Sequence, residues 1–210
     1  DPLGGEVRLG IIPTIAPYLL PKILAPLTAE FPNLNIQLTE GQTSQITRML
    51  KQGDLDAVLL ALPLQEENVE EFELYTEPFL FAAATEHPKA QQKSVNADDL
   101  QDEEVLLLED GHCLRDQALA VCQAHRGIES SSFTATSLET LRQLVAANRG
   151  ITLMPALAVP EQADNASGVC YIPFAGEVPS RTLGLCWRSS STRSGLLADI
   201  AQSLRQGLNT

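Results

Sequence analysis

The fold class of the chain is indicated by residues 7 to 62, VRLGIIPTIAPYLLPKILAPLTAEFPNLNIQLTEGQTSQITRMLKQGDLDAVLLAL. Three β-rich runs alternate in it with two segments whose apolar residues recur at helical spacing. This β-α-β-α-β order is typical of a mostly parallel sheet. The predicted strands are 7 to 13, 34 to 40 and 56 to 62, and the predicted helices are 14 to 31 and 44 to 55, the second ending near Gly53.

The remainder of the chain continues with strands and helices in a different order. The stretch at 72 to 88 is interpreted as strands broken at Pro78. Thr136 and Glu139 have the spacing of a capping box at the start of a middle helix. Further strands are predicted at 103 to 110, 132 to 136, 150 to 155, 168 to 174 and 181 to 188, and helices at 137 to 148 and 193 to 208.

The order of these elements predicts an α/β fold with two subdomains. The chain would cross between them near residues 76 to 80 and again near 175 to 181. The first subdomain would comprise 1 to 78 and 178 to 210, and the second, which contains the first two cysteines, would comprise 79 to 177. Because 44% of the 210 residues are hydrophobic, the chain can bury a sizeable core without disulfides.

The charge of the chain argues against direct binding of nucleic acid. It has 14 Lys and Arg against 27 Asp and Glu, which gives a formal net charge of −13, and no basic cluster stands out. If the whole protein binds DNA, another segment is expected to do so. The chain begins without Met and has no signal-like or membrane-spanning apolar run. These features predict a soluble fragment of a longer polypeptide with no membrane contact.

The four cysteines form neither a CxxC pair nor a secreted disulfide framework. Such usage is typical of a reducing compartment, and we therefore expect the protein to be cytoplasmic. Cys170 and Cys186 lie in predicted strands, and we expect them to be packing residues.

The other two cysteines lie nine residues apart in EDGHCLRDQALAVC, residues 109 to 122, which is predicted to be helical from Cys113 onward. Nine helical steps advance about 13.5 Å and turn about 900°, so the two thiols would lie on opposite faces of the helix. A disulfide needs Cα atoms roughly 4.4 to 6.8 Å apart. A bond between Cys113 and Cys122 would therefore require the helix to unwind.

The sequence predicts different surroundings for these two thiols. Cys113 lies at the expected N-terminus of the helix, and its neighbours His112 and Arg115 could also stabilise a thiolate. Cys122 follows Ala120 and Val121 and has the surroundings of a small buried hydrophobic residue. Ordinary packing of both cysteines remains an alternative at this point, because most free cysteines are simply buried.

Several segments together resemble the OxyR family of hydrogen-peroxide sensors among the LysR-type transcriptional regulators, over essentially the whole chain. EDGHCLRDQA is the diagnostic motif, and the other segments support the LysR-type effector-binding fold more than the ligand. These other segments are GIIPTIAPYLLP (10 to 21), EGQTSQ (40 to 45) and ATSLETLRQLVAANRGITLMPALAVP (135 to 160).

The resemblance implies a fold of two Rossmann-like subdomains with a cleft between them, similar to periplasmic solute-binding proteins. Full-length members of the family also carry an N-terminal winged helix-turn-helix and a linker helix, which this chain lacks. The resemblance thus implies a regulatory domain without its DNA-binding domain.

The resemblance also implies a role for each residue of the motif. Cys113 would be the peroxidatic cysteine, and Cys122 the resolving one. Thr14, Thr43 and His112 would hold the peroxide near the thiol. Arg115 and Asp116 belong to the same motif and Arg181 matches a basic position of the second crossover, so these three residues would be supporting residues.

The implied chemistry needs no cofactor and no metal. The thiolate would attack hydrogen peroxide to give a sulfenic acid, which would condense with the second thiol to a disulfide. Cellular dithiol reductants would reset the switch. The implied protein is a transcriptional activator rather than an enzyme. It would form a homodimer, and a tetramer at full length, contact DNA only through the missing domain, and have RNA polymerase as a further candidate partner.

Each of these residues also has an ordinary structural explanation. Thr14 and Thr43 fall at strand-to-helix turns and could be N-caps. His112 could be only a turn residue, and Arg115 and Asp116 could form a surface salt bridge.

Three other functions remain open from the sequence. A LysR-type cleft could bind a small anionic effector at helix N-termini near Thr14, Thr43 and Thr136. The cysteine pair could instead serve a thiol peroxidase with repeated turnover. A zinc sensor would use His112, Cys113, Cys122 and His125, although their spacing matches no common zinc pattern.

Overall fold

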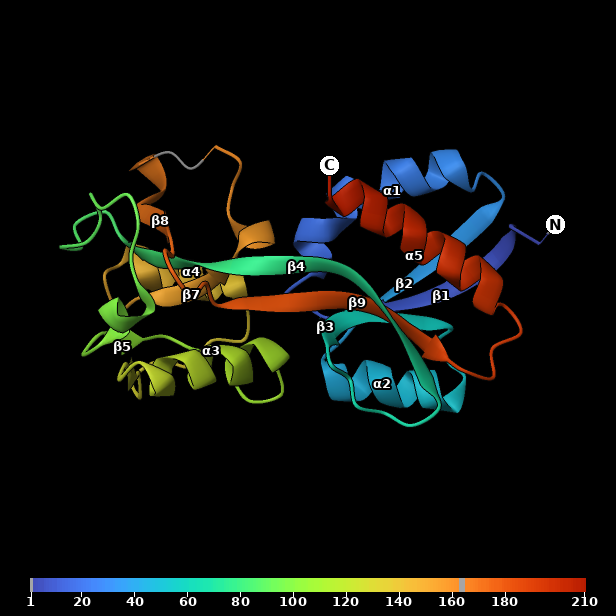
Figure 1. Cartoon of the computed structure of the whole chain (residues 1–210), viewed down its shortest axis with the longest axis horizontal. Coiled ribbons are helices and arrows are strands. Elements are labelled where there is room, and N and C mark those ends of the chain that lie inside the picture. The colour runs from blue at the N-terminus through green and yellow to red at the C-terminus, as the bar shows by residue number, and fades with distance from the viewer. Residues whose placement is uncertain (1, 163–164) are drawn as a thin grey trace. The chain divides into compact units, whose positions relative to one another are not determined.

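Parallel strands form the centre of the first of two compact units in a computed structural model, which describes residues 2 to 162 and 165 to 210 (Figure 1). This unit contains the chain up to Thr76 and then Thr182–Thr210. Strand β1 pairs in parallel with both β2 and β3, which confirms the predicted β-α-β-α-β order. The elements are β1 (Gly5–Ile11), α1 (Ala16–Glu30), β2 (Leu34–Glu40), α2 (Thr43–Gln52) and β3 (Ala57–Leu62).

The sheet of this unit becomes mixed where β3 meets the last strand. There β9 (Ser180–Arg188) pairs antiparallel with β3, and the chain ends in α5 (Ser194–Leu208). Helices α1 and α5 lie together on one face of the sheet and α2 on the other (Figure 1). With both faces covered, β3 is almost entirely buried, which explains its continuous apolar sequence.

The second unit, Glu77–Arg181, is built around the C-terminal half of β4 (Val69–Ala84). Strands β7 and β8 both pair antiparallel with β4, and helix α4 packs against them. A separate pair of short parallel strands, β5 and β6, lies beside α3. The elements are β5 (Glu104–Val105), α3 (Cys113–Ala124), β6 (Ile128–Glu129), α4 (Leu138–Ala146), β7 (Thr152–Pro155) and β8 (Val169–Pro173), with 3-10 turns at Ala97–Leu100, Ala156–Ala158 and Asn165–Ser167.

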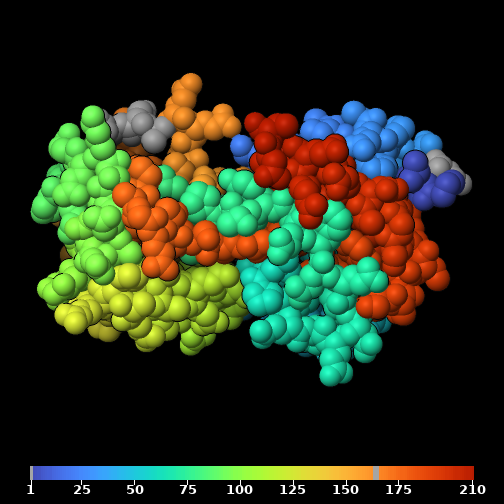
Figure 2. All heavy atoms as spheres, viewed as in Figure 1, coloured from blue at the N-terminus to red at the C-terminus, as the bar shows by residue number. Residues whose placement is uncertain are grey.

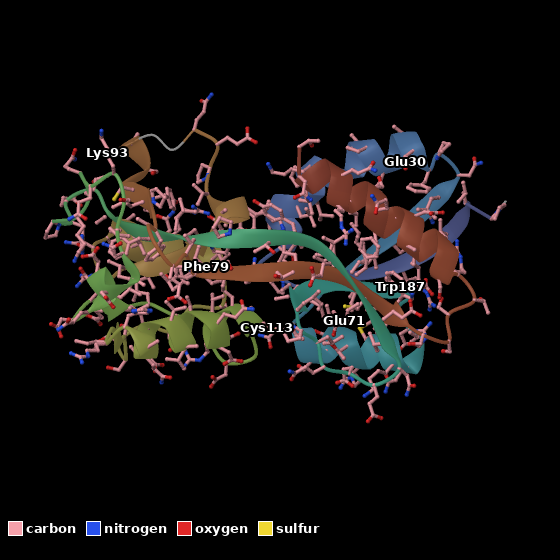
Figure 3. All side chains as sticks on the ribbon, in the orientation of Figure 1. Glu30, Glu71, Phe79, Lys93, Cys113 and Trp187 are labelled. Atoms are coloured by element: carbon pink, nitrogen blue, oxygen red, sulfur yellow. The ribbon has the colours of Figure 1, made fainter. Side chains whose placement is uncertain are left out.

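Pro78 does not break β4, so the predicted interruption was wrong. The strand continues through it, and the pairs with β7 begin only at the next residue, with Phe79 opposite Pro155. The missing N–H of Pro78 therefore precedes that ladder, where a proline is tolerated. Phe79, labelled in Figure 3, donates its own N–H to the carbonyl of Pro179 at 2.8 Å.

Two predicted strands of this unit are also corrected by the structure. The apolar run at 103 to 110 forms a strand only at Glu104–Val105, and the stretch at 132 to 136 forms only a single bridge, between Leu108 and Ala135. Residues 105 to 108 are nevertheless buried: the N–H of Leu106 donates to the carbonyl of Ile151, just before β7, and its carbonyl accepts the hydroxyl of Thr152 in β7. Burial, rather than a continuous ladder, explains the apolar sequence of this run.

Helix α4 begins one residue later than the proposed capping box, so the cap at Thr136 was wrong. Ser137 is the N-cap, and its Oγ accepts the N–H of Thr140 at 3.2 Å. We expect Ser137→Ala to lower the free energy of unfolding by about 1 kcal/mol, because one N–H of the first turn loses its acceptor. Urea unfolding followed by circular dichroism measures this loss. The exposed Thr136→Ala serves as the control, and an equal loss there would contradict the assignment.

A helix that spans a membrane must be both long and apolar. Among the residues that the structure describes, no helix meets both requirements.

Candidate functional site

The predicted peroxidatic cysteine lies at the N-terminal end of α3 (Figure 3). The chain turns at Gly111, whose φ of +99° lies in the left-handed region that favours glycine. His112 is the N-cap with extended backbone, and Cys113 is the first helical residue, half-buried. The first N–H groups of a helix lack partners within it, and the helix dipole favours negative charge there. This position suits a thiolate, and it confirms the helix boundary predicted from the sequence.

His112 is a buried residue rather than an exposed turn residue. Its side chain is 4% exposed, and its Nε2 lies 4.0 Å from Oε1 of Glu109. A buried imidazole that precedes the thiol directly can donate or accept a proton next to it, depending on its tautomer. Contact with a peroxide remains a prediction for this residue.

Arg115 is bound to three parts of the second unit at once. Its guanidinium lies 2.7 Å from Oε1 of Glu129 in β6 and 3.0 Å from Oδ1 of Asp110 in the preceding turn. It also donates to the carbonyl of Leu108 at 3.0 Å. The hydrogen bond that Arg115 donates to Glu129 raises the pKa of Arg115 further, despite burial. The ion pairs of Arg115 are therefore with Asp110 and Glu129, whereas Asp116 is exposed.

Cys122 is buried on the inner face of α3, as predicted. The apolar face of the helix consists of Leu114, Ala118 and Cys122, which are four residues apart. Gly127 leaves room for the sulfur, since a Cβ at that position would lie 2.9 Å from the Sγ of Cys122. Burial and, after it, the charge of Glu129 raise the pKa of the Cys122 thiol. Cys122 is therefore a weak nucleophile while α3 is intact.

The structure holds the cysteines as thiols. None of the four forms a disulfide, and α3 is continuous from Cys113 to Ala124. Over the nine residues that separate Cys113 from Cys122, a regular helix rises about 13.5 Å, more than a disulfide can span. A disulfide between them requires α3 to unwind.

Gln117 is a residue of this site that the sequence did not reveal. It lies four residues after Cys113 and therefore on the same side of α3. Its Oε1 is buried, and among the described residues it has no hydrogen-bond partner. An acceptor left without a donor costs about 1 to 3 kcal/mol, so a small ligand with an O–H group would satisfy it. Only a folded structure reveals such an orphaned atom.

Thr14 and Thr43 lie at one end of the sheet of the first unit. Thr14 follows β1 and Thr43 follows β2, and these parallel neighbours both end at that edge, with Ile11 opposite Glu40. Thr14 is 3% exposed. Neither threonine is an N-cap, since Ile15 and Gln42 occupy those positions. The capping explanation was thus wrong, and binding of a peroxide by these two residues remains a prediction.

Arg181 forms a fully buried ion pair that the sequence did not predict. Its Nε donates to Oε2 of Glu77 at 2.8 Å, and both side chains are 0% exposed. The other oxygen of Glu77 accepts the N–H of Leu157 at 2.6 Å. Buried charges are retained only when paired in this way. Arg181 thus has a structural partner in the second unit, and a supporting role in redox chemistry remains a prediction.

The remaining cysteines have the surroundings of packing residues. Cys186 is buried in β9, where burial and the charge of Glu71 raise the pKa of its thiol to about 12. Cys170 donates its S–H to the carbonyl of Ala83 at 3.3 Å, and burial raises the pKa of this thiol too. Both thiols are thus weak nucleophiles.

Two of the four candidate zinc ligands, His125 and Cys122, have contacts other than those of a metal site. His125 Nδ1 lies 2.9 Å from Oδ1 of Asp98, and Cys122 faces the core. Over residues 2 to 162 and 165 to 210, no group of three or more metal-ligating side chains is found.

Comparisons with known sequences place the whole chain in one family. The model of the LysR substrate binding domain matches residues 1–209. The hydrogen peroxide-inducible genes activator of Pectobacterium carotovorum is 43% identical over 206 residues, which are 98% of this chain and 68% of that protein. The DNA-binding transcriptional dual regulator OxyR of Escherichia coli K12 is 44% identical over 205 residues, 98% of this chain and 67% of that protein.

Comparisons with solved structures place the chain in the same family. The crystal structure of the oxidized form of OxyR matches with a TM-score of 0.91 and 44% identity, and covers 100% of this chain and 98% of its own. The reduced form of OxyR matches with a TM-score of 0.91 and 42% identity over the same shares of both chains. This chain therefore belongs to the LysR family, as a substrate-binding domain of the OxyR type.

Proposed function

We propose that this chain is the redox-sensing regulatory domain of a transcription factor that responds to hydrogen peroxide. The observation that carries the proposal is the arrangement of α3, with a half-buried thiol at its N-terminus and a buried thiol nine residues later. The relatives named for hydrogen peroxide support the choice of oxidant. In this proposal, Cys113 is the first residue to be oxidised and Cys122 then forms the disulfide.

The first step is oxidation of Cys113. Its thiolate sulfur attacks one oxygen of the peroxide, the O–O bond breaks, and the departing hydroxide takes a proton to become water. The product is a sulfenic acid. In this proposal the N-terminus of α3 stabilises the thiolate and His112 supplies the proton. Thr14 and Thr43 are proposed to hold the peroxide by hydrogen bonds from their hydroxyls.

The second step joins the two cysteines. The sulfur of Cys122 attacks the sulfenic sulfur of Cys113, an S–S bond forms, and the sulfenic oxygen leaves as water. The ring of about ten residues constrains the unfolded chain by roughly 2.5 to 3 kcal/mol, whereas each helical hydrogen bond lost from α3 costs about 0.5 to 1.5 kcal/mol. These opposing contributions bring the free energies of the reduced and the disulfide-bonded chain close together, so cellular dithiols can reset the switch.

The disulfide is proposed to act through refolding of the segment from 113 to 125. A refolded segment would alter contacts between copies of the chain in a homodimer or tetramer and so reorient DNA-binding domains outside this chain. We propose that the protein works in the cytoplasm, with RNA polymerase as a further candidate partner of the full-length factor.

Peroxide consumption distinguishes such a sensor from a thiol peroxidase. With excess peroxide and without reductant, the sensor takes up one equivalent per chain and stops at the disulfide. With a dithiol present, we expect consumption to be limited by slow reduction of the disulfide. Sustained rapid turnover measured with a peroxide electrode would instead support the peroxidase.

An anionic effector is the second candidate function. It is favoured by the positions of α1 and α2, which begin at the same edge of the sheet, because the dipole of a helix favours negative charge at its N-terminus. A ligand response that persists in Cys113→Ser would support this alternative.

We expect Gln117→Met to slow oxidation of Cys113 about tenfold, because loss of one hydrogen bond to the peroxide costs roughly 1.4 kcal/mol in the transition state. The free energy of unfolding should stay equal or rise, since Gln117 leaves a buried oxygen without a partner among the described residues. Stopped-flow kinetics with hydrogen peroxide measures the rate. The exposed Gln123→Met on the same helix is the control, and equal rates for the two variants would contradict the role of Gln117.

A further inference from the structure

Cys122 shares its face of α3 with Arg115. The two residues are seven positions apart, which turns a helix by about 700°, within roughly 20° of two full turns. Strand β6 packs against α3, and the chain reaches β6 directly from the end of the helix, since the N–H of Gly127 bonds to the carbonyl of Cys122 at 2.9 Å. On the opposite side of α3, Asp116, Ala120 and Gln123 are exposed. Figure 2 shows the segment of α3 at the surface of the second unit.

Strand β6 is short and buries little apolar surface. It consists of Ile128 and Glu129, and the side chain of Ile128 is 54% exposed, so apolar burial contributes little. Backbone hydrogen bonds join β6 to β5. The N–H of Ile128 donates to the carbonyl of Glu103 at 2.8 Å, and the N–H of Ser130 donates to the carbonyl of Val105 at 2.9 Å. Toward α3, the strand is held by the ion pair between Glu129 and Arg115.

The position of Glu129 also affects the chemistry of Cys122. Burial is the main cause of the raised pKa of this thiol, and the negative charge of Glu129 is the second. The same carboxylate thus holds β6 to the helix and disfavours the Cys122 thiolate.

We infer that Glu129 is a positioning residue for the second step: with Arg115 it holds β6 against the Cys122 face of α3 and so delays the resolving thiol. This inference rests on the proposed function. When α3 begins to unwind, Arg115 leaves Glu129, β6 is released, and the sulfur of Cys122 reaches the sulfenic acid. Glu129 forms and breaks no covalent bond in this sequence. It sets the delay between oxidation of Cys113 and closure of the disulfide.

The first test measures how readily Cys122 is reached. In a Cys113→Ser background, the rate of Cys122 alkylation by N-ethylmaleimide is followed by mass spectrometry of the digested protein. We expect Glu129→Gln to raise this rate about two- to fivefold, the range set by loss of a partly exposed ion pair. Glu86→Gln removes the same charge from an exposed position of the second unit and should leave the rate unchanged. An unchanged rate in Glu129→Gln, or an equal rise in Glu86→Gln, would overturn the inference.

The second test separates the two chemical steps. After mixing with peroxide, the chain that retains both cysteines should form sulfenic acid equally fast with and without Glu129→Gln, and form the disulfide faster with it. If Glu129→Gln loosened the whole fold, alkylation of Cys186 in the first test would rise together with that of Cys122. Such a rise would count against a specific role of Glu129. Absence of any disulfide in the unsubstituted chain would refute the proposed function. A disulfide that forms at the same rate in both chains would refute only the role of Glu129.

Discussion

Replacement of Cys113 by serine is expected to abolish the response to peroxide completely. The serine hydroxyl cannot form a sulfenic acid, and Cys122 cannot replace the missing thiol, because it is buried and its pKa is raised by that burial and by Glu129. With one equivalent of hydrogen peroxide, Cys113→Ser should show no disulfide and no oxidised Cys122. Cys122→Ser should instead accumulate sulfenic acid on Cys113, which dimedone traps.

Cys170→Ser is the matched control for these two variants. Cys170 is a free thiol of the same unit that bonds to the carbonyl of Ala83, so its loss should leave formation of the Cys113–Cys122 disulfide unchanged. Oxidation of Cys122 in the absence of Cys113 would contradict the proposed order of events. Loss of the disulfide in Cys170→Ser would point to a different pairing.

Breaking the buried ion pair should have the largest effect on stability. We expect Glu77→Ala to lower the free energy of unfolding by about 3 to 5 kcal/mol, because Arg181 would keep a charge in a place without water. The N–H of Leu157 would lose its acceptor as well. Urea unfolding followed by tryptophan fluorescence measures the loss, with Trp187 as the only tryptophan of the chain.

The double variant Glu77→Leu with Arg181→Met is the control for this prediction. Removal of both charges leaves none unpaired, so most of the stability should return. The same variant also tests the supporting role predicted for Arg181. If stability returns but Cys113 reacts more slowly with peroxide, Arg181 serves the redox site as well as the fold. A loss below about 1 kcal/mol in Glu77→Ala would contradict a buried pair, since only exposed pairs contribute so little.

Much of the fold could be predicted because regular elements have local signals. Alternation of apolar residues marked β2 at 34 to 40, and Gly53, which has a φ of +85°, ended α2 as predicted. The errors arose where a local pattern has two explanations. The apolar run after Glu103 is buried without a long ladder, and Pro78 lies just before the pairing with β7 begins.

The candidate site was predictable only as far as its residues are neighbours in the sequence. The helix start at Cys113 and the burial of Cys122 follow from a single segment. The partners that matter to this segment lie elsewhere in the chain or depend on side-chain packing. Glu129 reaches Arg115 over fourteen residues, and Glu77 reaches Arg181 over 104. One sequence contains no signal for such pairs, because either partner could be replaced by another acid or base.

We expect peroxide to join Cys113 to Cys122 by unwinding α3. Mass spectrometry of the alkylated and digested protein, before and after one equivalent of hydrogen peroxide, tests it most directly. We expect a peptide linked through Cys113 and Cys122 only after peroxide, with Cys170 and Cys186 still alkylated. Four thiols that remain equally alkylated after peroxide would show that these cysteines are packing residues, and the claim would be wrong.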